Sequence, residues 1–178
     1  MKDRTQTLYR QIARLTKNLL KMEESKDGVK TNLQKVTKTI VTSPEIYKPV
    51  GPYSQAILAN NKTLYVSGVL GLTPDAQFVP GGAVAQTRQA LQNMKFVLEA
   101  GGSSLDSVIK TTILLARMED FQGVNEVYAE FFPKDPPARA TYQVAKLPKD
   151  AAVEIEAIAL SGDLTTVAAG PCPCATDK

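Results

Sequence analysis

Apolar and polar residues alternate, or form short apolar runs, in six segments of the chain, and each segment predicts a β-strand. The segments are 37–41, 55–58, 63–67, 108–115, 139–145 and 153–160. Asn60-Asn61 separates the second segment from the third, as expected for a hairpin turn. The segment 108–115 is rich in β-branched and aliphatic residues, so we expect it to be buried.

Helical spacing marks two further segments. Apolar residues recur on one helix face between 84 and 100, and Gly101-Gly102 is expected to end that helix. Asp120 is expected to cap a second helix, whose apolar side carries Phe121, Val124, Val127, Tyr128 and Phe131. The order of elements predicts an α+β fold, a mixed sheet with both helices packed on one face. The other face would stay exposed unless a second subunit covers it, so we expect an oligomer.

The pattern divides the chain into a basic amphipathic N-terminal extension (1–35), a body (36–164) and a flexible C-terminal tail (165–178). Apolar residues of the extension share one helix face: Leu8, Ile12, Leu15, Leu19 and Met22. We expect this helix to dock on the body or on a partner subunit. The alternatives are a mitochondrial presequence and a helix that contacts RNA or an anionic membrane.

Composition narrows the possible chemistry. The chain of 178 residues carries a net charge of +3 and no histidine. The charge is too small to indicate a nucleic-acid binder by itself, and without histidine the imidazole-based triads, histidine zinc sites and histidine-pair ribonucleases are excluded. Cys172 and Cys174 in the tail cannot complete a zinc site within one chain. A body without cysteine fits a reducing compartment, and no apolar stretch is long enough to span a membrane.

Arg139 and Glu154 are the strongest candidates for chemistry. Arg139 follows a proline pair at the start of a strand, and its planar guanidinium fits a carboxylate through two hydrogen bonds. Strand alternation places Glu154 and Glu156 on the face opposite the predicted core. From the pattern alone, exposed glutamates and a salt bridge from Arg139 to one of them are the simpler interpretation.

Tyr53, Asn125 and Ser67-Gly68 are weaker candidates. Tyr53 follows a Gly-Pro turn and Asn125 lies in a predicted helix, where both residue types more often have structural roles. Ser67-Gly68 is expected to end a strand, where a glycine lets the backbone approach a ligand closely. No phosphate loop, dinucleotide fingerprint or metal motif is present.

Short motifs occur in order along the body: Gly51-Pro52-Tyr53-Ser54-Gln55-Ala56, Val66-Ser67-Gly68, Val108-Ile109-Lys110-Thr111-Thr112, Phe121 to Asn125, Pro137-Ala138-Arg139-Ala140, Leu147-Pro148-Lys149 and Val153-Glu154-Ile155-Glu156-Ala157. This ordered set resembles the Rid (YjgF/L-PSP) family of RidA-like 2-iminobutanoate/2-iminopropanoate deaminases. The resemblance implies a chorismate-mutase-like fold and a homotrimer with active sites between subunits. It also implies hydrolysis of small-molecule imines, such as the one derived from 2-aminoacrylate, to a 2-keto acid and ammonia without a cofactor.

By the same resemblance, Arg139 binds the substrate carboxylate and Glu154 orients the attacking water. The pocket would be lined by the Ser67-Gly68 backbone, Tyr53, Asn125 and Thr141. Many members of the family carry glutamine where this chain has Val69. That difference implies either a more apolar substrate or a change in packing.

Two rival functions stay open at this point. Some relatives are described as endoribonucleases that inhibit translation, and the basic extension is compatible with RNA. A ligand-binding or chaperone-like trimer with little turnover is the other. The expected location is the cytoplasm, or the mitochondrion if the extension is a presequence.

Overall fold

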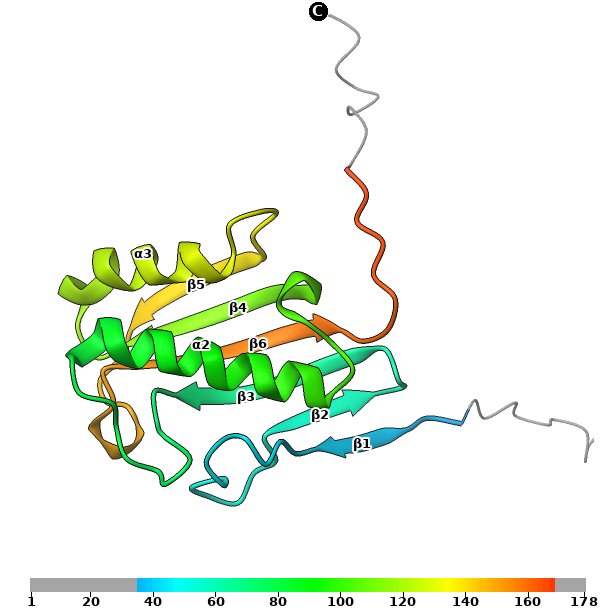
Figure 1. Ribbon diagram of the computed structural model, residues 1–178, viewed down its shortest axis with the longest axis horizontal. Helices are drawn as coiled ribbons and strands as arrows, with labels where there is room; N and C mark the ends of the chain where they lie inside the picture. Colours follow the sequence, from blue (N-terminus) through cyan, green and yellow to red (C-terminus); the bar gives the residue numbers. More distant parts are fainter. Residues whose placement is uncertain (1–34, 169–178) are drawn as a thin grey trace, which may run out of the picture. The chain divides into compact units, whose positions relative to one another are not determined.

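The computed structural model describes residues 35–168, where a mixed sheet carries two helices on one face (Figure 1). The predicted helix of the extension and both cysteines of the tail lie outside the described residues. The strand order in the sheet is β1-β2-β3-β6-β4-β5. The predicted α+β architecture is therefore confirmed, and the last strand within residues 35–168 lies in the middle of the sheet.

An antiparallel meander forms one half of the sheet, from β1 (Lys38–Val41) through β2 (Ala56–Ala59) to β3 (Thr63–Leu70). Asn60 and Asn61 form the predicted hairpin turn, with φ of 52° and 53°. The Lys62 N–H bonds Ala59 O at 3.0 Å, so residues 59–62 form a tight turn, and asparagine tolerates the positive φ at its two central positions well.

The other half of the sheet consists of β4 (Val108–Leu115), β5 (Ala138–Gln143) and β6 (Val153–Leu160). β4 and β5 are parallel, and β6 lies between β3 and β4, antiparallel to both. β6 thus joins the two halves, and its side chains lie beside residues from both of them. This central position decides what surrounds Glu154.

The two helices are α2 (Gly82–Ala100) and α3 (Phe121–Phe131). Gly102, with φ of 68°, ends α2 as predicted: its N–H bonds Glu99 O at 3.0 Å, and Ser103 N–H bonds Leu98 O at 2.9 Å, which is a Schellman motif. Asp120 stands at the N-cap of α3 but makes no side-chain capping bond, so that prediction was wrong. Its carboxylate accepts hydrogen bonds from Arg117 instead.

Three short 3-10 helices complete the described elements of the chain: Leu105–Ser107, Met118–Asp120 and Pro148–Asp150. They lead into β4, α3 and β6 respectively. The last of them ends in Lys149 and Asp150, which have φ of 57° and 59°.

The core lies between the helices and the sheet. Val153, Ile155, Ala157 and Ala159 of β6 are at most 4% exposed, as the alternation predicted. Leu91, Met94 and Leu98 of α2 are fully buried against the sheet. Val84, in the first turn of that helix, was expected on the same apolar face but is 46% exposed, so the prediction was wrong for this residue.

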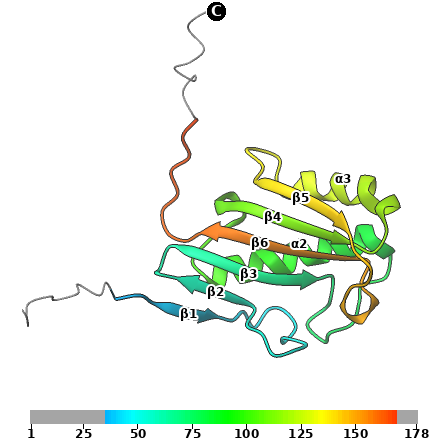
Figure 2. The same cartoon turned by 180° about the vertical axis from the view of Figure 1, so that it is seen from behind.

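No helix covers the opposite face of the sheet within residues 35–168 (Figure 2). Large apolar side chains are exposed on several strands, among them Ile40, Tyr65 and Tyr142. Since large exposed apolar patches mark interaction sites in soluble proteins, the expectation that a second subunit covers this face stays a prediction.

Candidate active site

Ser67 and Gly68 lie inside β3, where they form a β-bulge. The register passes from Val66 opposite Ala157 to Val69 opposite Ile155, so two residues of β3 face one residue of β6. The prediction that Ser67-Gly68 ends the strand was therefore wrong. On the side away from β6, the two residues just before β2 hold the bulge: Ser67 N–H bonds Gln55 O at 3.0 Å, and Ser67 Oγ donates to Ser54 O at 2.7 Å.

Glu154 of β6 lies directly over Gly68. A Cβ at position 68 would overlap Glu154 Oε1, so only glycine leaves room for the carboxylate in this position. The bulge and the glycine together make a hollow in β3 that the glutamate side chain fills. This gives the Ser-Gly pair a steric role that its place in the sequence motif does not reveal.

The Glu154 carboxylate is partly desolvated. Burial raises its pKa above the ordinary value for glutamate, and the nearby charge of Glu156 raises it further. Among the described residues no side chain donates a hydrogen bond to it or forms an ion pair with it. A carboxylate with a raised pKa is a better proton acceptor than an ordinary glutamate.

Two tyrosines stand beside this glutamate. Tyr47 is 3% exposed, and its hydroxyl accepts a hydrogen bond of 2.9 Å from the N–H of Leu70, the residue paired with Glu154. Burial raises the pKa of Tyr47 to about 12, with smaller contributions from Tyr53 and Glu154. Tyr53 is 39% exposed, and its hydroxyl accepts a hydrogen bond from the N–H of Val50 at 3.2 Å.

Tyr47, Tyr53, Ser67 and Gly68 line one small pocket, and with Glu154 we call them the glutamate cluster. Gln55 holds the loop that carries Tyr47: its side chain bonds the backbone of Ser43 and the carbonyl of Tyr47. Sequence reasoning missed Tyr47, although a tyrosine just before the Gly-Pro turn was a usable signal.

Arg139 of β5 belongs to a second group of residues. Its guanidinium carbon lies 4.8 Å from the centre of the Tyr128 ring, a cation–π geometry. The Tyr128 hydroxyl shares a hydrogen bond of 2.7 Å with Thr111 Oγ1, and both side chains are buried. Sequence reasoning assigned Tyr128 only to the apolar side of α3, so its contact with Arg139 was missed.

Asn125 and Thr141 bring unsatisfied polar atoms to the same helix-covered side of the sheet. Asn125 Oδ1 and Thr141 Oγ1 are buried, and neither has a hydrogen-bond partner within the described residues. Asn125, Tyr128 and Arg139 line a cleft whose other walls are apolar: Ala129, Phe132, Pro136 and Pro137. We call Asn125, Tyr128, Arg139 and Thr141 the arginine cluster.

The two clusters lie on opposite faces of the sheet. Arg139 is paired with Thr111, which is paired with Ala157 on the helix-covered face, whereas Glu154 alternates with Val153 and Ile155 and lies on the other face. β4 separates the two strands, so the residues are also roughly 10 Å apart sideways and about as far along the strands. A salt bridge between Arg139 and either glutamate of the same chain is therefore excluded.

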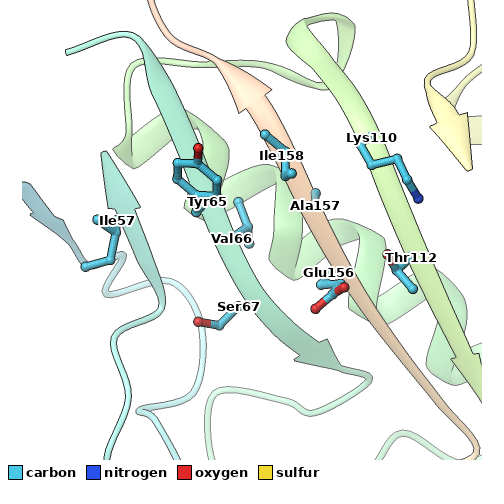
Figure 3. Close-up of a pocket in the computed structure, with 9 residues that line it drawn as sticks. All are labelled: Ile57, Tyr65, Val66, Ser67, Lys110, Thr112, Glu156, Ala157 and Ile158. Carbon is cyan, nitrogen blue, oxygen red and sulfur yellow. The ribbon is translucent and has the colours of Figure 1, made fainter. Parts of the chain in front are cut away.

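The uncovered face carries a shallow groove across its middle strands (Figure 3). Its lining comes from four strands and includes Ile57, Tyr65, Ser67, Lys110 and Glu156. Lys110 Nζ donates to the carbonyl of Thr111 at 2.8 Å, and Glu156 is exposed. Glu156 thus lies on the same face as Glu154 but outside the pocket of the glutamate cluster.

Val69 is 3% exposed and packs in the core. It also lines the small pocket of the glutamate cluster, so the difference from the common glutamine changes both the packing and the wall of that pocket. Within residues 35–168, no three histidine, cysteine, aspartate or glutamate residues gather closely enough to hold a metal ion. The described helices also include none with the length and apolarity needed to cross a membrane.

Comparison with known proteins finds a family and individual relatives that match most of this chain. Residues 42–161 match the family described as Endoribonuclease L-PSP. The chain is 49% identical over 132 residues to the RutC family protein UK114 of Drosophila melanogaster, which covers 74% of this chain and 95% of that protein. It is 44% identical over 135 residues to the 2-iminobutanoate/2-iminopropanoate deaminase of Homo sapiens, covering 75% and 98%.

Solved structures agree with this match. The crystal structure of yeast Mmf1 superposes with a TM-score of 0.68 at 39% identity, covering 71% of this chain and 100% of that one. The structure of E. coli TdcF with bound serine gives a TM-score of 0.65 at 34% identity, covering 70% and 99%. Both clusters fall inside the matched residues.

Proposed function

The chain belongs to the Endoribonuclease L-PSP (YjgF/Rid) family, and from this premise we propose that it hydrolyses reactive imines derived from amino acids to 2-keto acids and ammonia. Relatives 44% and 47% identical to it bear the name 2-iminobutanoate/2-iminopropanoate deaminase. One observation carries the proposal: an arginine and a desolvated glutamate are both left without an ionic partner among residues 35–168. Such groups are available to a substrate that carries a carboxylate and reacts with water.

In the proposed reaction, Arg139 holds the substrate carboxylate through two parallel hydrogen bonds. Glu154 accepts a proton from a water molecule as the water oxygen bonds the carbon of the iminium, which gives a carbinolamine. That proton then passes to the amine nitrogen. As the C–N bond breaks and ammonia leaves, Glu154 takes the proton of the hydroxyl group, so the carbonyl of the 2-keto acid forms and ammonia finally carries this proton away as ammonium. An iminium is already electrophilic, so positioning and modest acid–base help are sufficient for catalysis.

We further propose that the site forms between two copies of the chain, in a homotrimer. The support is geometric, because the clusters lie on opposite faces of one sheet and each presents half of the required chemistry. The arginine cluster of one copy would meet the glutamate cluster of its neighbour in a head-to-tail ring. The exposed apolar side chains of the uncovered face are suited to pack at the centre of such a ring.

Subunit complementation tests this arrangement directly. Arg139→Ala and Glu154→Gln are each expected to lower 2-iminopropanoate hydrolysis at least ~100-fold, since each removes half of the site. When the two variants are mixed randomly in one ring, about a quarter of the sites combine intact halves, so about a quarter of wild-type activity should return. Light scattering checks that the variants assemble. Near-normal turnover in Arg139→Ala, or no recovery in verified mixed rings, would contradict the proposal.

Endoribonuclease activity is the second candidate, because the matched family carries that description. Incubating a labelled single-stranded RNA with wild type, Arg139→Ala and Glu154→Gln separates the two functions. RNA cleavage that persists in both variants points to a second site, whereas ammonia release that both variants lose points to the deaminase.

We propose a cytoplasmic location. One relative, 51% identical over 125 residues, is named Reactive Intermediate Deaminase A, chloroplastic, so members of the family also occur in organelles. Residues 1–35 precede the match that begins at residue 42. Fusing residues 1–35 to a fluorescent protein decides the matter, since import of the fusion into an organelle would overturn the cytoplasmic location.

A further inference from the structure

We propose that Tyr128 is the positioning residue for Arg139, and that Thr111 holds Tyr128 in place. The inference rests on the proposed role of Arg139 as the group that binds the substrate carboxylate. It assigns a function to an aromatic residue that otherwise counts as part of the core. The three side chains form one line of contacts from the buried sheet to the open cleft.

The inner part of this line is fixed. Thr111 is fully buried in the middle of β4, and its Oγ1 lies 2.7 Å from the Tyr128 hydroxyl. The Tyr128 ring is 5% exposed and packs against the Phe132 ring, with 4.5 Å between their centres. A ring held at its hydroxyl end and along its side cannot turn freely, so it presents a defined surface to the guanidinium.

The outer part of the line is an exposed arginine on that surface. Of the three arginines within residues 35–168, Arg88 is paired with Glu130 and Arg117 with Asp120, and only Arg139 stands on an aromatic ring. A carboxylate partner would orient the guanidinium as well, but it would occupy the N–H donors that a substrate carboxylate needs. The Tyr128 ring contacts the guanidinium without accepting hydrogen bonds from its N–H groups, so these donors stay free for an anion.

The charge of Arg139 is also preserved by this arrangement. Burial raises the pKa of Tyr128, while the hydrogen bond with Thr111 and the charge of Arg139 lower it by less, so the phenol stays neutral. An uncharged support leaves the full positive charge available to an incoming anion. The geometry therefore combines a fixed position with an unneutralised cation.

Steady-state kinetics on 2-iminopropanoate tests the role. Tyr128→Leu removes the ring, and we expect KM to rise about two- to fivefold, the size of a cation–π contact at an exposed site, with little change in kcat. Tyr128→Phe keeps the ring and should give a smaller rise. Glu130→Gln is the matched control on the same helix, because it releases Arg88 instead, and its KM should stay at the wild-type value.

Two further readouts do not depend on turnover. The Nε–Hε resonance of Arg139 should carry a ring-current shift that disappears in Tyr128→Leu, while the Arg88 resonance stays in place. The affinity for pyruvate, a 2-keto acid, should fall by the same factor as KM rises. If Tyr128→Leu does not fold, Thr111→Val with the ring retained should broaden the Arg139 resonance and weaken pyruvate binding.

The outcomes separate this inference from the proposed function. An Arg139 resonance and a pyruvate affinity that are both unchanged in the folded variants overturn the role of Tyr128, whatever the activity of the wild type. A wild-type protein that binds pyruvate through Arg139 but releases no ammonia from imines overturns the proposed function instead. A kcat that falls with no change in KM would also overturn the positioning role.

Discussion

The glutamate cluster and the arginine cluster carry opposite charges, and different parts of the structure fix the two charged groups in position. Backbone geometry places Glu154: a bulge in β3 and a glycine with no Cβ make the space that the carboxylate fills. Side chains place Arg139, through the ring of Tyr128 and the hydroxyl of Thr111. The carboxylate is desolvated and its pKa is raised, whereas the guanidinium is exposed.

This difference corresponds to two chemical tasks. A group that exchanges protons benefits from partial burial, which moves its pKa toward the working pH. A group that binds an anion benefits from a full charge with free donors. The comparison also predicts how substitutions affect each cluster. Backbone atoms shape the glutamate cluster and cannot move aside, so a single substitution there should abolish its function. Side-chain contacts shape the arginine cluster, so substitutions there should reduce its function by degrees.

Gly68→Ala is expected to have the largest effect. A Cβ at position 68 overlaps Glu154 Oε1, so the carboxylate must move, and a displacement of this size should lower kcat/KM for 2-iminopropanoate at least ~100-fold. Gly51→Ala is the matched control, because its Cβ would meet only Tyr53 ring atoms at 3.5 Å, an ordinary contact.

Mixed oligomers show to which cluster Gly68 belongs. Gly68→Ala mixed with Arg139→Ala should recover activity, since the defects lie in different halves of the site. Gly68→Ala mixed with Glu154→Gln should recover none. Recovery in the second mixture would show that the overlap with Glu154 is not the cause of the loss.

The sheet and both helices could be predicted because their apolar residues repeat with the period of the element. The bulge also left a signal in the sequence. Alternation breaks at Ser67-Gly68, where Val69 and Leu70 follow as two consecutive buried residues, and a glycine inside a strand pattern is typical of a bulge. That pair was instead interpreted as the end of a strand, because the alternation stops there.

The separation of Arg139 from Glu154 could not be predicted from the pattern. It depends on β6 entering the sheet between β3 and β4, a choice made by long-range pairing rather than by local sequence. The resemblance to a family grouped the two residues in one site, and the fold of a single chain does not bring them together. Tyr128 was hidden for another reason, because it has the spacing of a core residue and is also buried like one.

Tyr47→Phe should have a moderate effect on stability. The Tyr47 hydroxyl is the acceptor for the buried N–H of Leu70, and leaving a buried donor unpaired costs about 1–3 kcal/mol of unfolding free energy. Tyr53→Phe is the control: its hydroxyl accepts from the exposed Val50, whose N–H can bond water instead, so the change should stay within about 0.5 kcal/mol. Urea unfolding of both variants measures the difference, and equal losses would contradict the assignment.

The pH dependence of catalysis should show the smallest effect and belongs to the glutamate cluster alone. The reaction needs ionised Glu154, whose pKa is raised first by burial and then by the charge of Glu156, so kcat should fall as the pH drops through that raised pKa. Glu156→Gln removes the second cause, so the acid limb of the kcat profile should move to lower pH. Because Glu156 is exposed, added salt should produce the same movement in wild type and almost none in the variant. Tyr128→Phe changes only the arginine cluster, so it should leave the acid limb of the kcat profile in place. If the acid limb moves in Tyr128→Phe but not in Glu156→Gln, the roles of the two clusters are the reverse of those proposed.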